Sequence, residues 1–219
     1  LFDTGLVATP NDFGHLGDPP SHPELLDYLA LRFVEDGWSV KKIIRSILLS
    51  RTWRQSGKVS ALAVDVDPRN RLLSRYPLRR LEAEALRDSL LSVAGQLDPR
   101  LFGSFVFPYH EKESPRTIEK HLYRGPLDGE GRRAIYTRVS IMEPPPFLAL
   151  FNQPDPKIPT GRRDVTSSIP QSLALLNGPL TREMAERWAE RLIAGEDVDP
   201  GARLRRMFRS AYARDVKQE

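Results

Sequence analysis

Apolar residues recur at intervals of three and four along several stretches of this chain, and proline or glycine marks the ends of most of these stretches. This spacing places the apolar side chains on one face of an α-helix, while proline is favoured in a first helical turn and glycine just after a last one. The pattern predicts helices over residues 22–36, 40–48, 68–76, 81–95, 170–176, 179–192 and 200–212.

Two of the helix starts carry capping signals. Ser21 followed by Glu24 has the pattern of a capping box, in which each side chain bonds the backbone of the other residue. Ser39 is expected to cap the next helix. The apolar stripe of that helix continues without a gap through Val40, Ile43, Ile44, Ile47 and Leu48. We expect this stripe to be buried, because an unbroken apolar face is typical of a helix that packs against a core.

Residues 133–142 favour a β-strand, because β-branched side chains alternate along them. Residues 98–131 show no helical period and are expected to form a long loop or insertion. The predicted fold class is therefore mainly α: an irregular multi-helix domain with long ordered loops and at most one or two short strands. Residues 1–219 are expected to form it as a single helical domain.

Composition excludes several classes of protein. The 219 residues contain no cysteine, which rules out disulfides, thiolate zinc sites and cysteine nucleophiles. No run reaches the roughly 18 to 20 consecutive apolar residues of a membrane-spanning helix, so no membrane span is expected. The formal net charge of +4 permits a polyanionic partner without requiring one. Because the chain starts at Leu1 without a signal-like segment, we expect a fragment of a larger multidomain protein.

A candidate metal site lies in the turns near the N-terminus. Asp12, His15, Asp18 and His22 lie close in sequence and offer oxygen and nitrogen ligands for a hard or borderline cation. Their spacing matches no metal-binding motif, and aspartates in turns commonly bond the nearby backbone instead. Asp12 and His22, with Asn11 of the same loop, are also candidates for binding another ligand.

A second group of candidates lies on or just before the predicted helix 81–95. Arg80, Glu84 and Asp88 follow one another at intervals of four, so on a helix they share a face. Either carboxylate could act as an acid or base if its pKa were raised. Neighbouring arginines lower carboxylate pKa values, which favours a structural ion-pair network. Five further arginines could converge on a carboxylate, sulfate or phosphate group: Arg132, Arg133, Arg138, Arg162 and Arg163.

Signatures of known catalytic and cofactor sites are missing from the sequence: a phosphate-binding glycine loop, a dinucleotide fingerprint, paired metal-binding histidines, a nucleophile elbow and a haem attachment motif. One alternative is helix-turn-helix DNA binding, because the helix at 40–48 follows a short turn and carries Lys41, Lys42 and Arg45. The preceding helix carries acidic residues that phosphates would repel, which disfavours nucleic acid as a partner.

Several longer motifs, in the same order along nearly the whole chain, resemble a planctomycete domain of unknown function. They occupy residues 5–14, 20–27, 37–39, 53–56, 67–73, 79–88, 132–136, 163–166 and 170–177. In that family the domain lies at the C-terminal end of large exported proteins, after a second uncharacterised domain and often with a cytochrome c-like domain. The resemblance implies a periplasmic or cell-envelope location, neighbouring domains as partners, and any haem on a separate domain rather than in this chain. It implies no established activity and no catalytic residues.

The leading hypothesis is a non-catalytic interaction or scaffold domain of an exported envelope protein, which docks neighbouring domains or binds an extracellular polysaccharide. The alternative is a subdomain of a polysaccharide-acting enzyme, with Asp12, Glu84 or Asp88 as acid and base. Two such carboxylates would have to face a cleft about 5 to 10 Å apart. That hypothesis loses its chemistry if these carboxylates are bonded to arginines or to the backbone.

Overall fold

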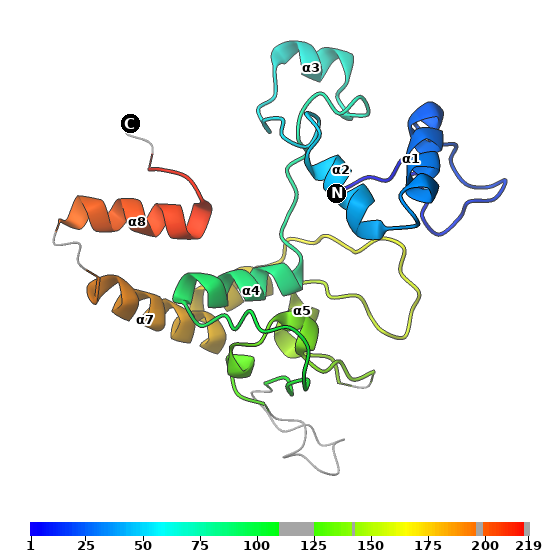
Figure 1. Ribbon diagram of the computed structural model, residues 1–219. Helices are drawn as coiled ribbons and strands as arrows, with labels where there is room; N and C mark the ends of the chain where they lie inside the picture. The colour runs from blue at the N-terminus through cyan, green and yellow to red at the C-terminus, as the bar shows by residue number, and fades with distance from the viewer. Residues whose placement is uncertain (110–124, 142, 196–198, 217–219) are drawn as a thin grey trace. The chain divides into compact units, whose positions relative to one another are not determined.

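A computed structural model describes residues 1–109, 125–141, 143–195 and 199–216. Within these ranges the chain is mainly helical, so the predicted mainly α fold is confirmed. Figure 1 shows helices joined by long irregular connections. None of the helices in these ranges has the length and apolar character needed to cross a membrane.

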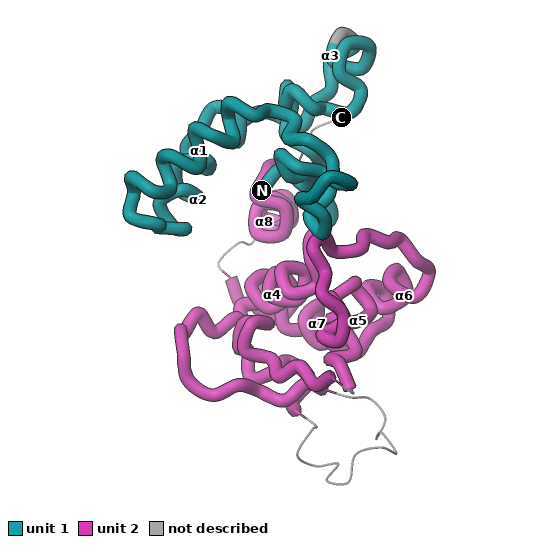
Figure 2. Tube along the Cα trace, turned by 90° about the vertical axis from the view of Figure 1, so that its right-hand side faces the viewer, with its two compact units in different colours: residues 1–80 teal, residues 81–219 magenta. Residues whose placement is uncertain are grey.

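The chain divides into two compact units, Leu1–Arg80 and Leu81–Glu219 (Figure 2). The helices of the N-terminal unit are α1 (Pro23–Glu35), α2 (Val40–Leu48) and α3 (Ala61–Val66). Those of the C-terminal unit are α4 (Ala83–Ala94), the 3-10 helices η2 (Gly129–Gly131) and η3 (Ala134–Tyr136), α5 (Pro146–Leu150), α6 (Ile169–Asn177), α7 (Pro179–Ile193) and α8 (Pro200–Tyr212). The single folding domain expected from the sequence stays a prediction.

The first two helices begin in different ways. α1 starts with Pro23, whose missing N–H is no loss in a first turn, and its N-cap His22 makes no side-chain capping bond. The predicted capping box at Ser21 is therefore wrong, and Ser21 Oγ lies 2.9 Å from His22 Nδ1 instead. α2 begins as predicted, because Ser39 Oγ accepts a hydrogen bond from the Lys42 N–H at 3.4 Å.

A Schellman motif ends α1. The Gly37 N–H donates to Val34 O at 3.0 Å, and the Trp38 N–H donates to Phe33 O at 2.8 Å. Gly37 and Trp38 both take positive φ angles, 73° and 61°. The Trp38 ring packs edge-on against the Phe33 ring, with centroids 5.4 Å apart, and this contact holds the tryptophan in a conformation that few non-glycine residues adopt.

The helix predicted to start at Asp67 and Pro68 is wrong. A short helix, α3, precedes these residues, and Asp67 is its C-cap. The Asp67 carboxylate accepts bonds from the Arg71 N–H at 2.9 Å and the Leu72 N–H at 2.8 Å. These bonds stabilise a non-helical turn in place of helical backbone bonds, which is how aspartate side chains commonly compete with helices.

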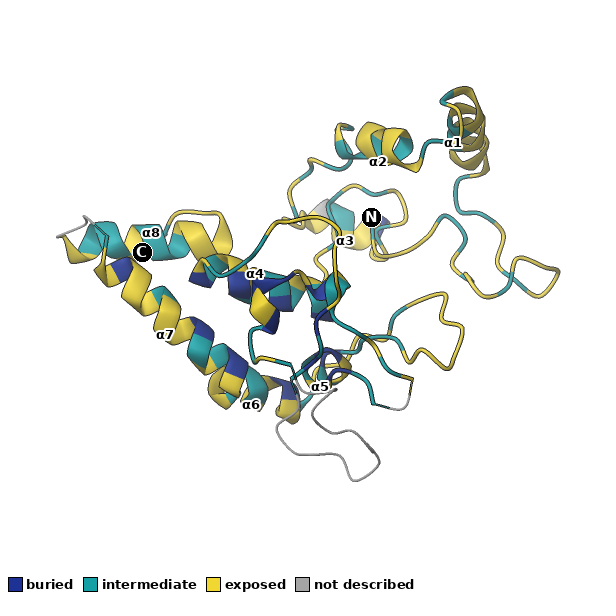
Figure 3. Ribbon diagram, turned by 60° about the horizontal axis from the view of Figure 1, so that its bottom comes forward, coloured by how far each residue is buried: buried dark blue, intermediate teal, exposed yellow. Residues whose placement is uncertain are grey.

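The core of the C-terminal unit forms around α4, which packs against α7, α5 and η3. One apolar cluster consists of Ala83, Ala134, Leu148 and Phe151. The other consists of Leu91, Ala94, Leu180 and Met184. Figure 3 shows buried residues along α4, α5 and α7. The helices predicted at 81–95, 170–176, 179–192 and 200–212 correspond to α4, α6, α7 and α8 and are confirmed.

The strand predicted for 133–142 is wrong for the residues that the structure describes. Residues 134–136 form η3, and Thr137 makes only an isolated bridge with Val106. Ile135 is 73% exposed, which shows that its β-branched side chain is not packed against a neighbouring strand. Residue 142 lies outside the described residues, as do residues 110–124 of the predicted loop 98–131. The described parts of that loop are irregular apart from η2 and the isolated bridges at Asp98 and Val106.

Candidate functional site

Arg87, on the buried side of α4, bonds two loop carbonyls. Its Nη1 donates to the carbonyl of Arg132 and its Nη2 to the carbonyl of Asp128, each at 2.8 Å. Gly129 lies beside this guanidinium with a φ of +62°, and a Cβ there would collide with Nη2. Burial lowers the pKa of the Arg87 guanidinium below its usual range, although nearby Asp88 opposes this shift. Arg87 therefore acts as a buried tether between α4 and the loop.

Arg132 is a second buried tether. Its side chain is 2% exposed and pairs with Asp98, with Nη1 and Oδ2 3.7 Å apart. Nη1 also donates to Arg100 O at 2.8 Å and Nη2 to Phe102 O at 2.6 Å. The guanidinium lies 4.0 Å from the centroid of the Tyr136 ring. Its donors bond backbone carbonyls, so Arg132 is placed to hold a loop rather than to bind a surface anion.

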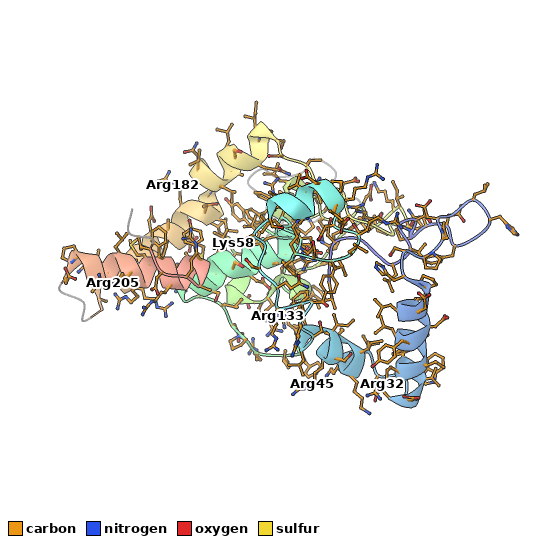
Figure 4. The ribbon with its side chains drawn as sticks, turned by 90° about the horizontal axis from the view of Figure 1, so that it is seen from above. Arg32, Arg45, Lys58, Arg133, Arg182 and Arg205 are labelled. Atoms are coloured by element: carbon orange, nitrogen blue, oxygen red, sulfur yellow. The ribbon has the colours of Figure 1, made fainter. Side chains whose placement is uncertain are left out.

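The structure gives Arg133 and Arg163 of the predicted anion clamp partners of their own. Arg133, labelled in Figure 4, is partly exposed, and its Nε lies 3.9 Å from Asp88 Oδ2. Arg163 donates to Glu84 Oε2 at 2.6 Å. This bond raises the pKa of the Arg163 guanidinium above its usual range. Arg132, Arg133 and Arg163 therefore hold separate partners instead of converging on one site.

Asp88 and Glu84, the carboxylates predicted on α4, are both engaged. Asp88 Oδ1 accepts the Ala134 N–H at 2.7 Å and lies 3.4 Å from Arg87 Nη1. Burial raises the pKa of the Asp88 carboxyl, and the bond from Ala134 and the charge of Arg87 counter this shift. Glu84 is bonded to Arg163. α4 begins at Ala83, so exposed Arg80 precedes the helix and does not share a helical face with Glu84 as predicted.

The N-terminal candidates lie in a loop that their own side chains brace. Asp12 Oδ1 accepts the Gly14 N–H at 2.8 Å. Thr9 Oγ1 donates to Asp12 O at 2.9 Å and accepts the Asp18 N–H at 2.9 Å. His22 contacts Ser21 Oγ, whereas Asn11 and His15 are exposed. In the described part of the chain, no three histidines, aspartates or glutamates gather as a set of metal ligands, so the structure does not bring the four predicted ligands together.

An apolar stripe on the outer side of α1 is the feature that sequence reasoning missed. The outer stripe consists of Tyr28, Leu31 and Val34, which follow one another at intervals of three and are neighbours on the helix surface. All three are exposed, Leu31 by 66%. Trp38, just after the helix, is 69% exposed.

The packing of α2 against α1 leaves both helices without a buried residue (Figure 3). The expectation that the α2 stripe is buried is therefore wrong: Val40 and Ile44 are exposed, and the rest of the stripe is half-buried. The spacing of Tyr28, Leu31 and Val34 at intervals of three indicates a second apolar side on α1. A helix that is apolar on more than one side is typically covered on more than one side.

Comparison with known proteins gives a family and no closer relative. A family model described as PSD1, protein of unknown function (DUF1553), matches residues 1–219. No curated protein and no solved structure matches the chain. The chain therefore belongs to the PSD1 family of proteins of unknown function.

Proposed function

We propose that this chain is a non-catalytic interaction domain that docks a neighbouring domain of its own polypeptide. The observation that carries the proposal is the exposed outer stripe of α1, and Trp38 just after the helix is exposed as well. Apolar residues scattered singly over a surface need no partner, but contiguous ones mark interaction sites. Aromatic side chains such as Trp38 are enriched where interfaces carry their binding energy.

The size of the stripe favours a tethered partner. Fully burying a side chain of this kind stabilises by about 1.5 to 3 kcal/mol. Tyr28, Leu31 and Val34 are already partly covered, so their burial would contribute on the order of 3 to 5 kcal/mol. Free association of two proteins costs an estimated 4 to 15 kcal/mol, which this gain barely offsets. For a domain in the same polypeptide the free-energy cost of association is much smaller, because the linker gives it a high effective concentration.

Charges of both signs surround the apolar residues. Arg32 of α1 pairs with Glu35 at 3.5 Å and with Asp36 at 3.8 Å, and Arg45 lies on α2 (Figure 4). A rim of mixed charge is typical of protein interfaces. A nucleic-acid surface instead concentrates positive charge. The arrangement therefore disfavours the helix-turn-helix alternative.

The C-terminal unit suits a scaffold. Arg87 bonds the backbone at Asp128 and Arg132 to α4, and Arg132 bonds the backbone at Arg100 and Phe102, so that irregular backbone has a fixed position. The carboxylates considered for a polysaccharide-acting enzyme are bonded to arginines or backbone, and that bonding does not favour an acid–base pair.

The setting of this domain follows from the resemblance alone. It supports an exported protein of the periplasm or cell envelope, in which any haem lies on a separate domain. Binding of an extracellular glycan is a second candidate function. The exposed Trp38 ring, which packs edge-on against Phe33, favours this candidate, because the apolar face of a sugar ring can stack on an aromatic ring.

Because the chain has no cysteine, a thiol introduced into it is unique within these residues, and its labelling rate measures exposure. We would compare Leu31→Cys on the outer stripe with Leu16→Cys, a control at a residue that is 94% exposed in the N-terminal loop. Peptide mass spectrometry would follow maleimide labelling in the 219-residue chain and in the full polypeptide of its gene.

If the stripe is docked, Leu31→Cys should react at least about tenfold more slowly in the full polypeptide, whereas Leu16→Cys should react equally in both. A tenfold change in rate corresponds to a free energy of about 1.4 kcal/mol for opening the docked interface. Equal labelling of Leu31→Cys in both contexts would overturn the proposal. Protection of Leu31→Cys by dextran or dextran sulfate, added to the chain alone, would favour the glycan candidate instead.

A further inference from the structure

The C-terminal unit contains a cavity of about 210 Å³ that the interaction proposal does not use. Its walls come from the loop before η2, from α5 and from the junction between α6 and α7. Apolar side chains dominate the walls, among them Phe107, Leu127, Phe147, Leu148 and Leu180. Prolines at the starts of α5 and α7 also line it, and their φ angles are fixed. These prolines therefore stiffen the parts of the wall that α5 and α7 supply.

Most of the polar side-chain groups that line this cavity already have partners. Arg87 donates to two carbonyls and lies beside Asp88. Thr181 Oγ1 donates to Ala174 O at 2.9 Å. Thr137 Oγ1, by contrast, is buried and has no hydrogen-bond partner among the described residues. A buried hydroxyl without a partner is costly, and a bound molecule could satisfy it.

We propose that this cavity binds a small neutral molecule about the size of one substituted ring, with an apolar body and one hydroxyl group that bonds Thr137. The volume supports this class, because dry apolar cavities of about 150 Å³ bind benzene. The hydroxyl of Thr137 can both donate and accept, so it fits an alcohol or a phenol.

Among the described residues that line the cavity, no cation is free to pair with a charged ligand, so the proposed ligand is uncharged. The Arg87 guanidinium donates hydrogen bonds to two carbonyls, and its charge is partly neutralised by Asp88 at 3.4 Å. A carboxylate entering this apolar space would lose its hydration without gaining an unpaired cation. Three probes that share one ring separate these possibilities: toluene, benzyl alcohol and benzoate.

The test measures the dissociation constants of these three probes by ligand-observed NMR on the full 219-residue chain, on Thr137→Val and on Thr181→Val. Thr181→Val is the matched control, because it removes a hydroxyl that lines the same cavity but already has a partner. Circular dichroism confirms that each variant is folded.

We expect benzyl alcohol to bind the unmodified chain about three- to tenfold more tightly than toluene, the usual effect of one net hydrogen bond. Benzoate should bind more weakly than either. Thr137→Val should make benzyl alcohol and toluene bind equally while toluene affinity is kept, and Thr181→Val should preserve their difference.

Three results would overturn the inference. Absence of binding by all three probes would mean that the cavity takes no ring-sized ligand. Preference for benzoate would show that the ligand class is anionic. A benzyl alcohol preference that survives in Thr137→Val would assign the anchoring role to another group. The ratio in the unmodified chain keeps the proposal falsifiable even if a variant fails to fold.

Discussion

Replacing Arg87 by methionine tests the idea that buried arginines hold the loops of the C-terminal unit. Methionine keeps much of the length of the side chain but removes both 2.8 Å bonds to the carbonyls of Asp128 and Arg132. It also leaves half-buried Asp88 without its nearest buried cation. The variant therefore removes the tether with little change in volume.

The size of the effect follows from these contacts. A hydrogen bond that involves a charged group contributes about 1.5 to 3 kcal/mol. Two such bonds are lost, while the cost of burying the guanidinium, visible in the lowered pKa of Arg87, is also removed. We expect a net loss of about 3 to 4 kcal/mol in the free energy of unfolding. For a chain of this size, that corresponds to a fall in Tm of roughly 6 to 16 °C.

Urea unfolding, followed by the fluorescence of Trp188 on α7, measures this loss within the C-terminal unit. All variants would carry phenylalanine at Trp38 and Trp53, so that Trp188 alone reports. Arg187→Met is the matched control, because its i,i+4 pair with Glu183 at 2.9 Å is solvent-exposed and should contribute little to stability. A loss below about 1 kcal/mol for Arg87→Met, or one equal to the control's, would refute the tether reasoning.

Three further predictions concern single groups. Gln171→Leu should lower the free energy of unfolding by about 2 to 4 kcal/mol, because the buried amide donates to Leu150 O at 2.9 Å and accepts the Ser168 N–H at 3.1 Å. A Tm within about 2 °C of the parent's, which corresponds to a stability loss of at most about 1 kcal/mol, would contradict this. Without ligand, Thr137→Val should be neutral or stabilising, whereas Thr181→Val should cost about 1 kcal/mol; the opposite order in urea would contradict the hydrogen-bond assignment. The pKa of the Asp67 carboxyl lies below 3.8, chiefly because the Leu72 N–H donates to the carboxylate. The ionised carboxylate therefore stabilises the folded state fully above the pKa that Asp67 has in the unfolded chain, and this stabilisation is lost as pH falls through its pKa in the folded chain. Asp67→Asn should therefore show a smaller fall in Tm than the parent between about pH 6 and pH 3, and equal falls would contradict it.

The sequence predicted the helices where apolar spacing and caps agree. Ser39 and Asp199 cap α2 and α8 as their types indicate, and Gly95 ends α4 in the left-handed conformation that glycine favours. These signals are local, because the cap and its partner lie within one turn. The same locality explains the error at Asp67, whose carboxylate bonds N–H groups in the following turn instead of starting a helix.

The candidate site depended on contacts that no local pattern encodes. Arg87 reaches carbonyls 41 and 45 residues away, so its burial could not be read from the charged cluster around it. The failed strand has a similar cause. Alternating β-branched residues need a partner strand, and Val106 supplies only a single bridge to Thr137. The exposure of the outer stripe depends on what covers α1, and the spacing of Tyr28 and Leu31 alone does not contain that information.

Amide hydrogen exchange of α1 tests the central claim most directly, because it requires no substitution. The measurement compares residues 23–38 in the isolated 219-residue chain with the same residues in the full polypeptide of its gene. The docking account predicts fast exchange in the isolated chain and slowing of at least about tenfold in the full polypeptide, since a partner that binds only the folded helix stabilises it. Equal exchange in both, or full protection already in the isolated chain, would contradict it.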